Sequence, residues 1–175
     1  MPLRTLFRMA MPALAALAIS ACGWHLRGEI PGSKEARTLF VSGIGPRVPF
    51  YSDFTQIFIT SGGILATVPS QASAVVHIVS ADHQRRPITL SQQGRANTFD
   101  LSFRVIYDVR TPKGEILIPK QELEVRRDYF NDQISPLGQG EEEAMYRVEM
   151  QKDAAKTLLR RVIYTLRQQK SASPS

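Results

Sequence analysis

The chain has few of the residues that would tie it together covalently or hold it in a membrane. Among its 175 residues there is one cysteine, so an intrachain disulfide is excluded and the fold depends on packing alone. A membrane-spanning helix needs about 20 apolar residues, whereas the apolar run 9–19 is short and interrupted by Pro12, and no later run is longer. We therefore expect no transmembrane anchor.

The single cysteine stands at an informative position. Arg4 and Arg8 precede the apolar run, and Ile19-Ser20-Ala21-Cys22 follows it. A basic start, an apolar centre and small residues before a cleavage point are typical of a secretory signal. With cysteine after the cut, the run resembles the lipobox of bacterial lipoproteins, in which the thiol receives a diacylglycerol. We interpret Cys22 as a lipid-attachment site; the alternative is an ordinary signal peptide with an incidental cysteine.

The net charge gives a weaker indication of the kind of partner. Without residues 1–21, 20 basic and 16 acidic residues remain, which gives a net charge of +4. A mild basic excess suits an anionic membrane surface or a phosphorylated lipid. It is too small to favour nucleic acid, and we expect no nucleic-acid partner.

Hydrophobic periodicity predicts an α+β fold. Apolar and polar residues alternate from Phe99 to Val109, broken only at Ile106, as in a strand with one buried and one wet face. Pro119 marks a later strand as an edge or a bulge. The predicted order is β-α-β-β-β-α, with strands at 38–42, 74–90, 99–109 and 116–129 and helices at 49–61 and 141–167. The simplest solution is a two-layer sandwich: a four-stranded, mainly antiparallel sheet with two helices on one face and a more polar, open second face.

The predicted organisation has four parts. They are a signal peptide (1–21), a lipidated tether (22–36), the α+β domain (37–167) and a flexible tail (168–175). The last helix carries a predicted apolar stripe on one side. That stripe consists of Ala144, Val148, Ala155, Leu158, Leu159, Val162 and Leu166.

Catalytic signatures are weak, and we predict no enzyme activity, metal site or cofactor. His77 and His83 lie six residues apart on one predicted strand, too far to share a metal, and we interpret His77 as a hydrogen-bonded residue of the sheet. Asp100, Arg104 and Asp108 recur every four residues on one strand face. We interpret them as members of cross-strand ion pairs rather than as a carboxylate pair for acid–base chemistry.

Several runs resemble the LptE family of lipopolysaccharide-assembly lipoproteins. The most specific is Cys22-Gly23-Trp24-His25-Leu26-Arg27, which is similar to the start of the mature family members. The β-α-β-β-β-α order is also similar, as are three further runs: Tyr107-Asp108-Val109-Arg110, Arg127-Asp128-Tyr129-Phe130 and Asp153-Ala154-Ala155.

The resemblance implies a non-enzymatic protein at the outer membrane, facing the periplasm and a barrel lumen. Such a protein plugs the LptD barrel, supports its assembly and binds lipopolysaccharide on its way to the outer leaflet. The alternative is a free-standing periplasmic lipoprotein that maintains the envelope or assists a transporter.

Antiparallel connectivity brings two predicted loops, 91–95 and 131–140, to the same end of the sheet. Basic residues gather near that end, and guanidinium groups pair well with the phosphates of lipid A. The alternative is a solvated basic rim. The candidate lipopolysaccharide-binding residues are Arg85, Arg86, Arg95, Arg126 and Arg127.

Overall fold

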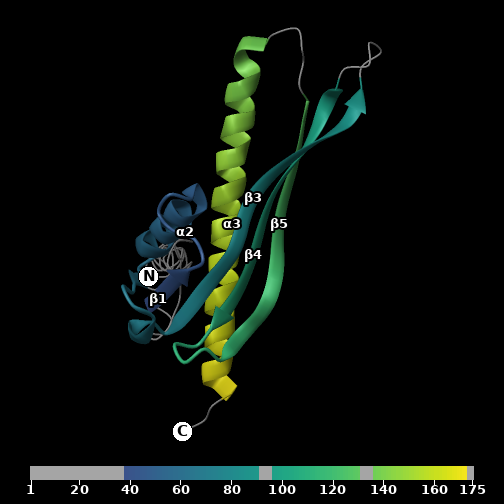
Figure 1. Ribbon diagram of the computed structural model, residues 1–175. Helices are drawn as coiled ribbons and strands as arrows, with labels where there is room; N and C mark the ends of the chain where they lie inside the picture. Colours follow the sequence, from purple (N-terminus) through teal and green to yellow (C-terminus); the bar gives the residue numbers. More distant parts are fainter. Residues whose placement is uncertain (1–37, 91–95, 131–135, 173–175) are drawn as a thin grey trace, which may run out of the picture.

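The computed structural model describes residues 38–90, 96–130 and 136–172 (Figure 1). The fold is α+β, with two helices packed against each other and against a five-stranded mixed sheet of order β2-β1-β3-β4-β5. The elements are β1 (Thr38–Ser42), α2 (Pro49–Thr60), β2 (Ile64–Leu65), the short 3-10 helix η2 (Pro69–Gln71), β3 (Ala74–Leu90), β4 (Ala96–Arg110), β5 (Ile116–Phe130) and α3 (Pro136–Ala172).

The predicted four-stranded sheet is wrong by one strand. The additional strand, β2, pairs in parallel with β1 through Thr38–Ile64 and Leu39–Leu65. Two residues are too few to produce a periodic signal in the sequence. β1 also runs parallel to β3, whereas β3, β4 and β5 form the expected antiparallel meander. Pro119 lies in β5, which is an edge strand as its proline predicted.

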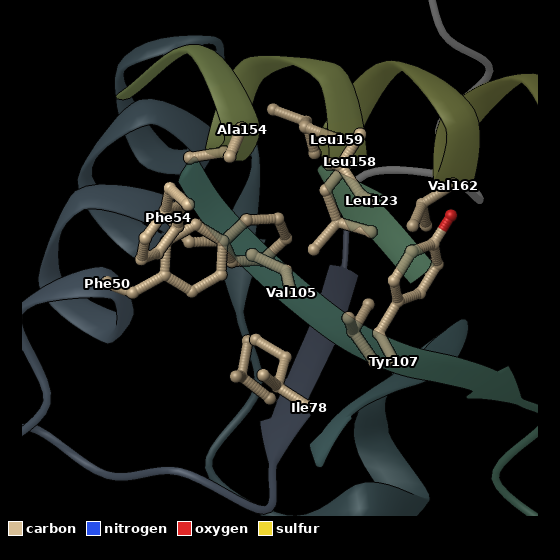
Figure 2. Close-up of a cluster of buried hydrophobic side chains, with 14 of the residues drawn as sticks. Phe50, Phe54, Ile78, Val105, Tyr107, Leu123, Ala154, Leu158, Leu159 and Val162 are labelled. Atoms are coloured by element: carbon tan, nitrogen blue, oxygen red, sulfur yellow. The ribbon is translucent and has the colours of Figure 1, made fainter. Parts of the chain in front are cut away.

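The core lies between the helices and one face of the sheet (Figure 2). Phe50, Phe54 and Phe58 recur every four residues of α2, which places all three on the buried side of that helix. They meet β4, where the ring centroids of Phe50 and Phe103 are 5.4 Å apart. Each fully buried side chain of this size stabilises the fold by about 1.5 to 3 kcal/mol. The core is therefore concentrated where α2 covers the sheet.

α3 is longer than the sequence predicted. It begins at Pro136 and continues to Ala172, whereas the periodic pattern predicted a helix over 141–167. Its 37 residues correspond to about 55 Å of helix and the 12 residues of α2 to about 18 Å. Figure 1 shows the first half of α3 and the far ends of β3 to β5 extending beyond α2.

The predicted apolar stripe of α3 is wrong at two of its residues. Val148 is 46% exposed and Ala144 is also exposed, although both recur in phase with the buried Ala155 and Val162. Both precede Met150, the first buried residue among the described side chains of α3, and this end of the helix extends beyond α2 (Figure 1). The buried residues of α3 are Met150, Ala154, Ala155, Leu158, Leu159, Val162 and Ile163.

We divide the molecule into two halves. The distal half comprises residues 83–90 of β3, 96–103 of β4, 125–130 of β5 and 136–151 of α3. The proximal half comprises the other described residues, including β1, β2 and α2.

Candidate functional site

The predicted convergence of strand ends is present in the distal half. Leu90 pairs with Ala96, and Thr98 pairs with Phe130, so β3, β4 and β5 reach the same end of the sheet. Arg95 and Cys22 lie outside the described residues, as does most of the two predicted loops. The candidate site is therefore built here from the remaining four arginines.

Those arginines do not form one cluster, because they are divided between the two faces of the sheet. Neighbouring residues of a strand point to opposite faces, and directly paired residues point to the same face. Arg85, Leu101 and Arg127 form one row across β3, β4 and β5 on the helix side, where Leu101 is fully buried. Arg86 and Arg126 therefore lie on the opposite, open face.

Arg85 is held between the sheet and α3. Its Nε lies 3.2 Å from Glu143 Oε2, and its guanidinium carbon lies 3.6 Å from the centroid of the Phe99 ring. An ion pair and a cation–π contact together orient a guanidinium in a defined position.

Arg127 is held in a similar way by residues of the next two turns of α3. Its Nη1 lies 2.5 Å from Glu149 Oε2, and its guanidinium carbon is 4.8 Å from the centroid of the Tyr146 ring. Both helix-side arginines thus connect the sheet to carboxylates of α3.

Glu143 is the centre of these contacts. It accepts hydrogen bonds from the Tyr129 hydroxyl and from Arg147 Nη2, the latter at 2.6 Å. Partial burial by itself raises the pKa of Glu143, but the hydrogen bonds from Tyr129 and Arg147 and the charges of Arg147 and Arg85 outweigh it, so the pKa lies below its usual value. The carboxylate is therefore ionised at neutral pH and joins α3 to two strands.

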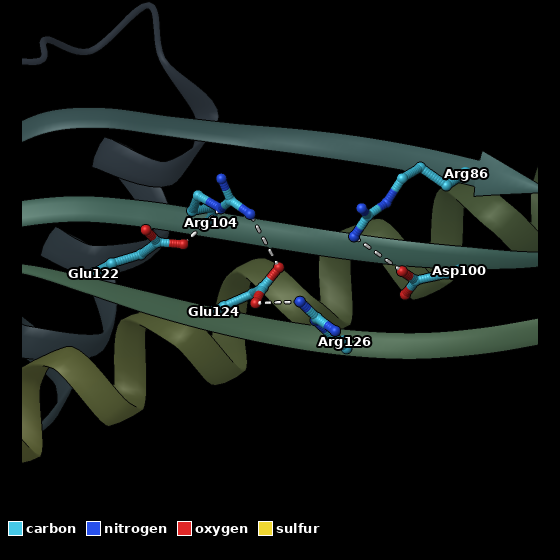
Figure 3. A network of polar contacts seen from close by, with 6 residues as sticks. All are labelled: Arg86, Asp100, Arg104, Glu122, Glu124 and Arg126. Carbon is cyan, nitrogen blue, oxygen red and sulfur yellow. Dashed lines mark hydrogen bonds and ion pairs between the residues drawn. The ribbon is translucent and has the colours of Figure 1, made fainter.

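Ion pairs run across the open face (Figure 3). Arg86 Nη2 lies 3.4 Å from Asp100 Oδ2, and Arg126 Nη2 lies 2.9 Å from Glu124 Oε2. The hydrogen bond from Arg126, which outweighs partial desolvation, lowers the pKa of Glu124. Arg104 lies between two carboxylates, 2.6 Å from Glu122 and 3.4 Å from Glu124.

Carboxylates outnumber guanidinium groups on this face. Its paired rows from Ser80–Ile106–Glu122 to Arg86–Asp100–Asp128 bring five carboxylates together with three arginines. The carboxylates belong to Asp82, Asp100, Glu122, Glu124 and Asp128, and the guanidinium groups to Arg86, Arg104 and Arg126. An anion that approaches here must compete with carboxylates already present, so the positive charge of the arginines on this face is partly neutralised.

A shallow hollow lies beside these residues. Its volume is about 370 Å³, and it is lined by Ile88, Asp100, Arg126, Arg127 and Asp128. Ile88 is 51% exposed, so the hollow combines an apolar wall with two arginines and two aspartates.

The sequence predicted that Asp100, Arg104 and Asp108 belong to cross-strand ion pairs. The structure confirms this for Asp100 and Arg104 only. Asp100 and Arg104 form cross-strand ion pairs, whereas the buried Asp108 accepts a 2.6 Å hydrogen bond from Arg110 of its own strand. His77 was predicted to be a hydrogen-bonded residue of the sheet. The prediction is wrong for its Nδ1 atom, which is buried without a hydrogen-bond partner in the described part of the chain.

The described ranges contain neither a candidate metal centre nor a membrane-spanning helix. Residues 38–90, 96–130 and 136–172 contain no group of three His, Asp or Glu side chains that could hold a metal ion. Within the same ranges, neither helix combines the length and apolar character required to cross a membrane.

Sequence reasoning missed the carboxylates that hold the helix-side arginines. Glu143 and Glu149 belong to a helix start that reads as a solvated acidic face. The spacing of Glu143 and Arg147 was the available signal, because side chains four residues apart are neighbours on a helix. The contacts with Arg85 and Arg127 depend on strand register, which the sequence does not display.

Comparisons with known proteins agree with this architecture. A family model described as LptE, lipopolysaccharide-assembly, matches residues 36–162. The chain is 23% identical over 150 residues to the LPS-assembly lipoprotein LptE of Photorhabdus laumondii subsp. laumondii, covering 86% of this chain and 81% of that relative. It is 24% identical over 151 residues to the LPS-assembly lipoprotein LptE of Pectobacterium atrosepticum, with the same coverage of both chains.

Solved structures give the same result. The solution structure of lipoprotein B from Nitrosomonas europaea aligns with a TM-score of 0.68 at 26% identity, covering 81% of this chain and 90% of that one. The crystal structure of the rare lipoprotein B from Shewanella oneidensis aligns with a TM-score of 0.60, covering 77% and 97%, and at 18% identity it supports the fold alone. Because the family model spans most of the described domain, the chain belongs to the LptE family of non-enzymatic lipopolysaccharide-assembly lipoproteins.

Proposed function

We propose that this protein is the plug subunit of an LptD-like outer-membrane barrel, that it supports assembly of that barrel, and that it contacts lipopolysaccharide in transit. In this proposal residues 1–21 are the cleaved signal, Cys22 carries the lipid anchor and 22–36 form the tether. The protein then faces the periplasm and the barrel lumen.

The open, ion-paired face of the sheet is the observation that carries the proposal. The interior of a large outer-membrane barrel is polar and water-filled. A face made of ion pairs within and between strands suits such a wall, because its side chains are already paired and remain partly hydrated. β3 has 17 residues and spans roughly 50 Å, longer than the roughly 30 Å apolar core of a bilayer. The sheet is thus long enough to follow a lumen from end to end.

Among the candidate arginines, Arg86 and Arg126 are the most available for a lipid phosphate. Their side chains are 57% and 58% exposed, and each makes one ion pair, which contributes little in water. Arg85 and Arg127 are 39% and 37% exposed and are each held by a carboxylate and a ring. We therefore assign the first phosphate contact to Arg86 and Arg126, with Arg95 as a further candidate from the adjoining loop.

Co-purification tests the plug proposal. Tagged protein would be purified from outer membranes in detergent, with a photo-crosslinking residue at Gln84 or Glu122 of the open face. Lys156, exposed on α3, is the matched control position. We expect a one-to-one complex with a large barrel and crosslinks to it from Gln84 and Glu122 in preference to Lys156. Recovery of the lipoprotein alone would contradict the plug role and favour the free-standing alternative.

Binding to immobilised lipopolysaccharide tests the arginine assignment. The double variant Arg86→Ala and Arg126→Ala removes two charge-assisted phosphate contacts and should weaken binding roughly ten-fold. Arg104→Ala is the matched control, because Arg104 lies on the same face further from the strand ends. Unchanged binding by the double variant, or an equal loss with Arg104→Ala, would remove the assignment.

A further inference from the structure

The edge of the sheet where the described chain begins is almost free of charge. Between residues 38 and 81 only Arg47 and Asp53 carry a charge at neutral pH, and residues 54–81 contain no Asp, Glu, Lys or Arg. Charged residues make up 22% of the whole chain, so a stretch of this length without one is a marked local departure. It includes most of α2, all of β2 and η2 and the first half of β3.

Three apolar side chains are exposed along this edge. They are Ile59 (53%), Ile64 (60%) and Val68 (42%). Scattered exposed apolar residues are normal, but Ile64 is paired beside Thr38 at the start of β1. A turn closed by the Gly62 amide on the Ile59 carbonyl leads from α2 into β2, and Val68 follows β2 directly before η2. We call Ile59, Ile64 and Val68 the charge-free edge. In the described ranges no further strand pairs with the outer side of β2.

The position of this edge relative to the proposed anchor at Cys22 decides which part of the protein stays near the lipid surface. Fifteen residues separate Cys22 from Thr38. A flexible chain of that length has an average end-to-end distance of roughly 20 Å and a maximum of roughly 50 Å. Since β1 and β3 run in parallel from this edge, the far end of β3 lies about 50 Å further away. An anchor at Cys22 therefore keeps the charge-free edge, and not the arginines, close to the lipid surface.

We propose that the charge-free edge rests on the bilayer that holds the Cys22 lipid, with Ile64 at the boundary between head groups and acyl chains. A charged side chain would lose hydration on entering that boundary, whereas an apolar one gains by leaving water. The surrounding Ser, Thr and Gln side chains can hydrogen-bond to head groups. The inference rests on the acylation of Cys22 within the proposed function and does not depend on the barrel.

Quenching of tryptophan fluorescence by brominated lipids tests the contact. The acylated full-length protein would carry Trp24→Phe together with either Ile64→Trp or Ile88→Trp. The two positions are similarly exposed, at 60% and 51%, but Ile64 lies in β2, beside the start of β1, whereas Ile88 lies near the far end of β3. In phosphatidylethanolamine–phosphatidylglycerol vesicles containing phosphatidylcholine brominated on its acyl chains, we expect roughly two-fold loss of emission at position 64 and little loss at position 88.

A charged substitution sharpens the test. Ile59→Glu, added to the Ile64→Trp protein, should restore most of the emission, because a carboxylate resists entry into the boundary. Thr60→Ser, at the neighbouring exposed position, should leave the quenching unchanged.

The outcomes separate this proposal from the one on which it depends. If intact mass shows that Cys22 carries no lipid, the anchor is wrong and the contact falls with it. If Cys22 is acylated and position 64 is quenched no more than position 88, the contact alone is overturned. Emission at position 64 that is already blue-shifted in detergent and is insensitive to bromine would also overturn it, because residues 23–37 would then cover the edge.

Discussion

The two halves of the sheet are joined to α3 by different forces. In the proximal half α3 and α2 meet the strands through apolar side chains such as Leu158, Phe54 and Val105, all fully buried. In the distal half buried apolar side chains such as Leu101 and Met150 are still present, and Glu143 and Glu149 of α3 add bonds to arginines and a tyrosine of the sheet. Burial of apolar surface is insensitive to salt, whereas partly exposed ion pairs are screened by it. The proximal half therefore supplies most of the stability, and the distal half is the more readily altered by an anionic ligand.

Truncation of one aromatic residue in each half should give the largest difference in unfolding free energy between the halves. Phe54→Ala leaves a cavity in the proximal core and should lower the free energy of unfolding by about 3 to 5 kcal/mol. Tyr146→Ala, at a half-buried position of the distal half, should cost much less. Urea denaturation measures both variants, and equal losses would show that stability is shared evenly between the halves.

The turn after β1 should be nearly as sensitive. Gly43 has a φ of +89°, and a Cβ atom at this position would lie 2.0 Å from the Ile78 carbonyl oxygen. Gly43→Ala should therefore cost roughly 3 kcal/mol, from the left-handed backbone together with the clash. Gly114 has a similar φ of +92° with open space around it, so Gly114→Ala should cost about 1 kcal/mol. Thermal unfolding of the two variants separates the effect of the clash from that of the left-handed backbone. Equal decreases in Tm would show that the clash contributes nothing.

Neutralising the central carboxylate should loosen the distal half alone. Glu143→Gln removes the charge that holds Arg85 and Arg147 and should lower the free energy of unfolding by about 1 to 2 kcal/mol. Amide hydrogen exchange should increase at the start of α3 and at the ends of β3 and β5. Faster exchange in α2 as well would show that the two halves unfold as one unit.

The smallest expected effect is a dependence on pH at the boundary between the halves. The His83 ring packs against Phe103 at a tilt of 44°, and its Nε2 lies 2.8 Å from Gln151 Nε2. Burial and the charge of Arg147 lower the pKa of His83 to about 4, against the opposing charges of Asp82 and Glu143.

Because the folded pKa is below the unfolded value of about 6.5, the unfolded chain binds the proton first as the pH falls. Stability should therefore decline between about pH 6.5 and pH 4 and no longer change through this group below that range. Solvent screening of the half-exposed ring limits the loss to about 1 kcal/mol. His83→Gln should flatten this part of the curve of unfolding free energy against pH, and an unaltered curve would assign it to other groups.

The elements of the fold were largely predictable because their periods are local properties. The alternation after Phe99 and the four-residue recurrence of Phe50, Phe54 and Phe58 identify a strand and a helix without reference to any partner. β2 was not predictable, since two residues acquire strand geometry only by pairing with β1. Likewise, whether a periodic position such as Val148 is buried depends on the length of a different helix.

The candidate site was predictable in its location but not in its arrangement. Antiparallel connectivity alone placed the basic residues at one end of the sheet. The division of Arg85 and Arg127 from Arg86 and Arg126 depends on which residue of β3 pairs with which residue of β4, and a shift of one residue would exchange the faces.

The sequence by itself determined the resemblance of the run before Cys22 to a lipobox, the order of the long elements and the family resemblance, because each follows from residue identity and spacing along the chain. The tertiary structure decided which side chains are buried, which carboxylate each arginine meets and where a charge-free edge gathers. These features depend on contacts between residues distant in sequence, whose energies exist only once strand register and helix packing are established.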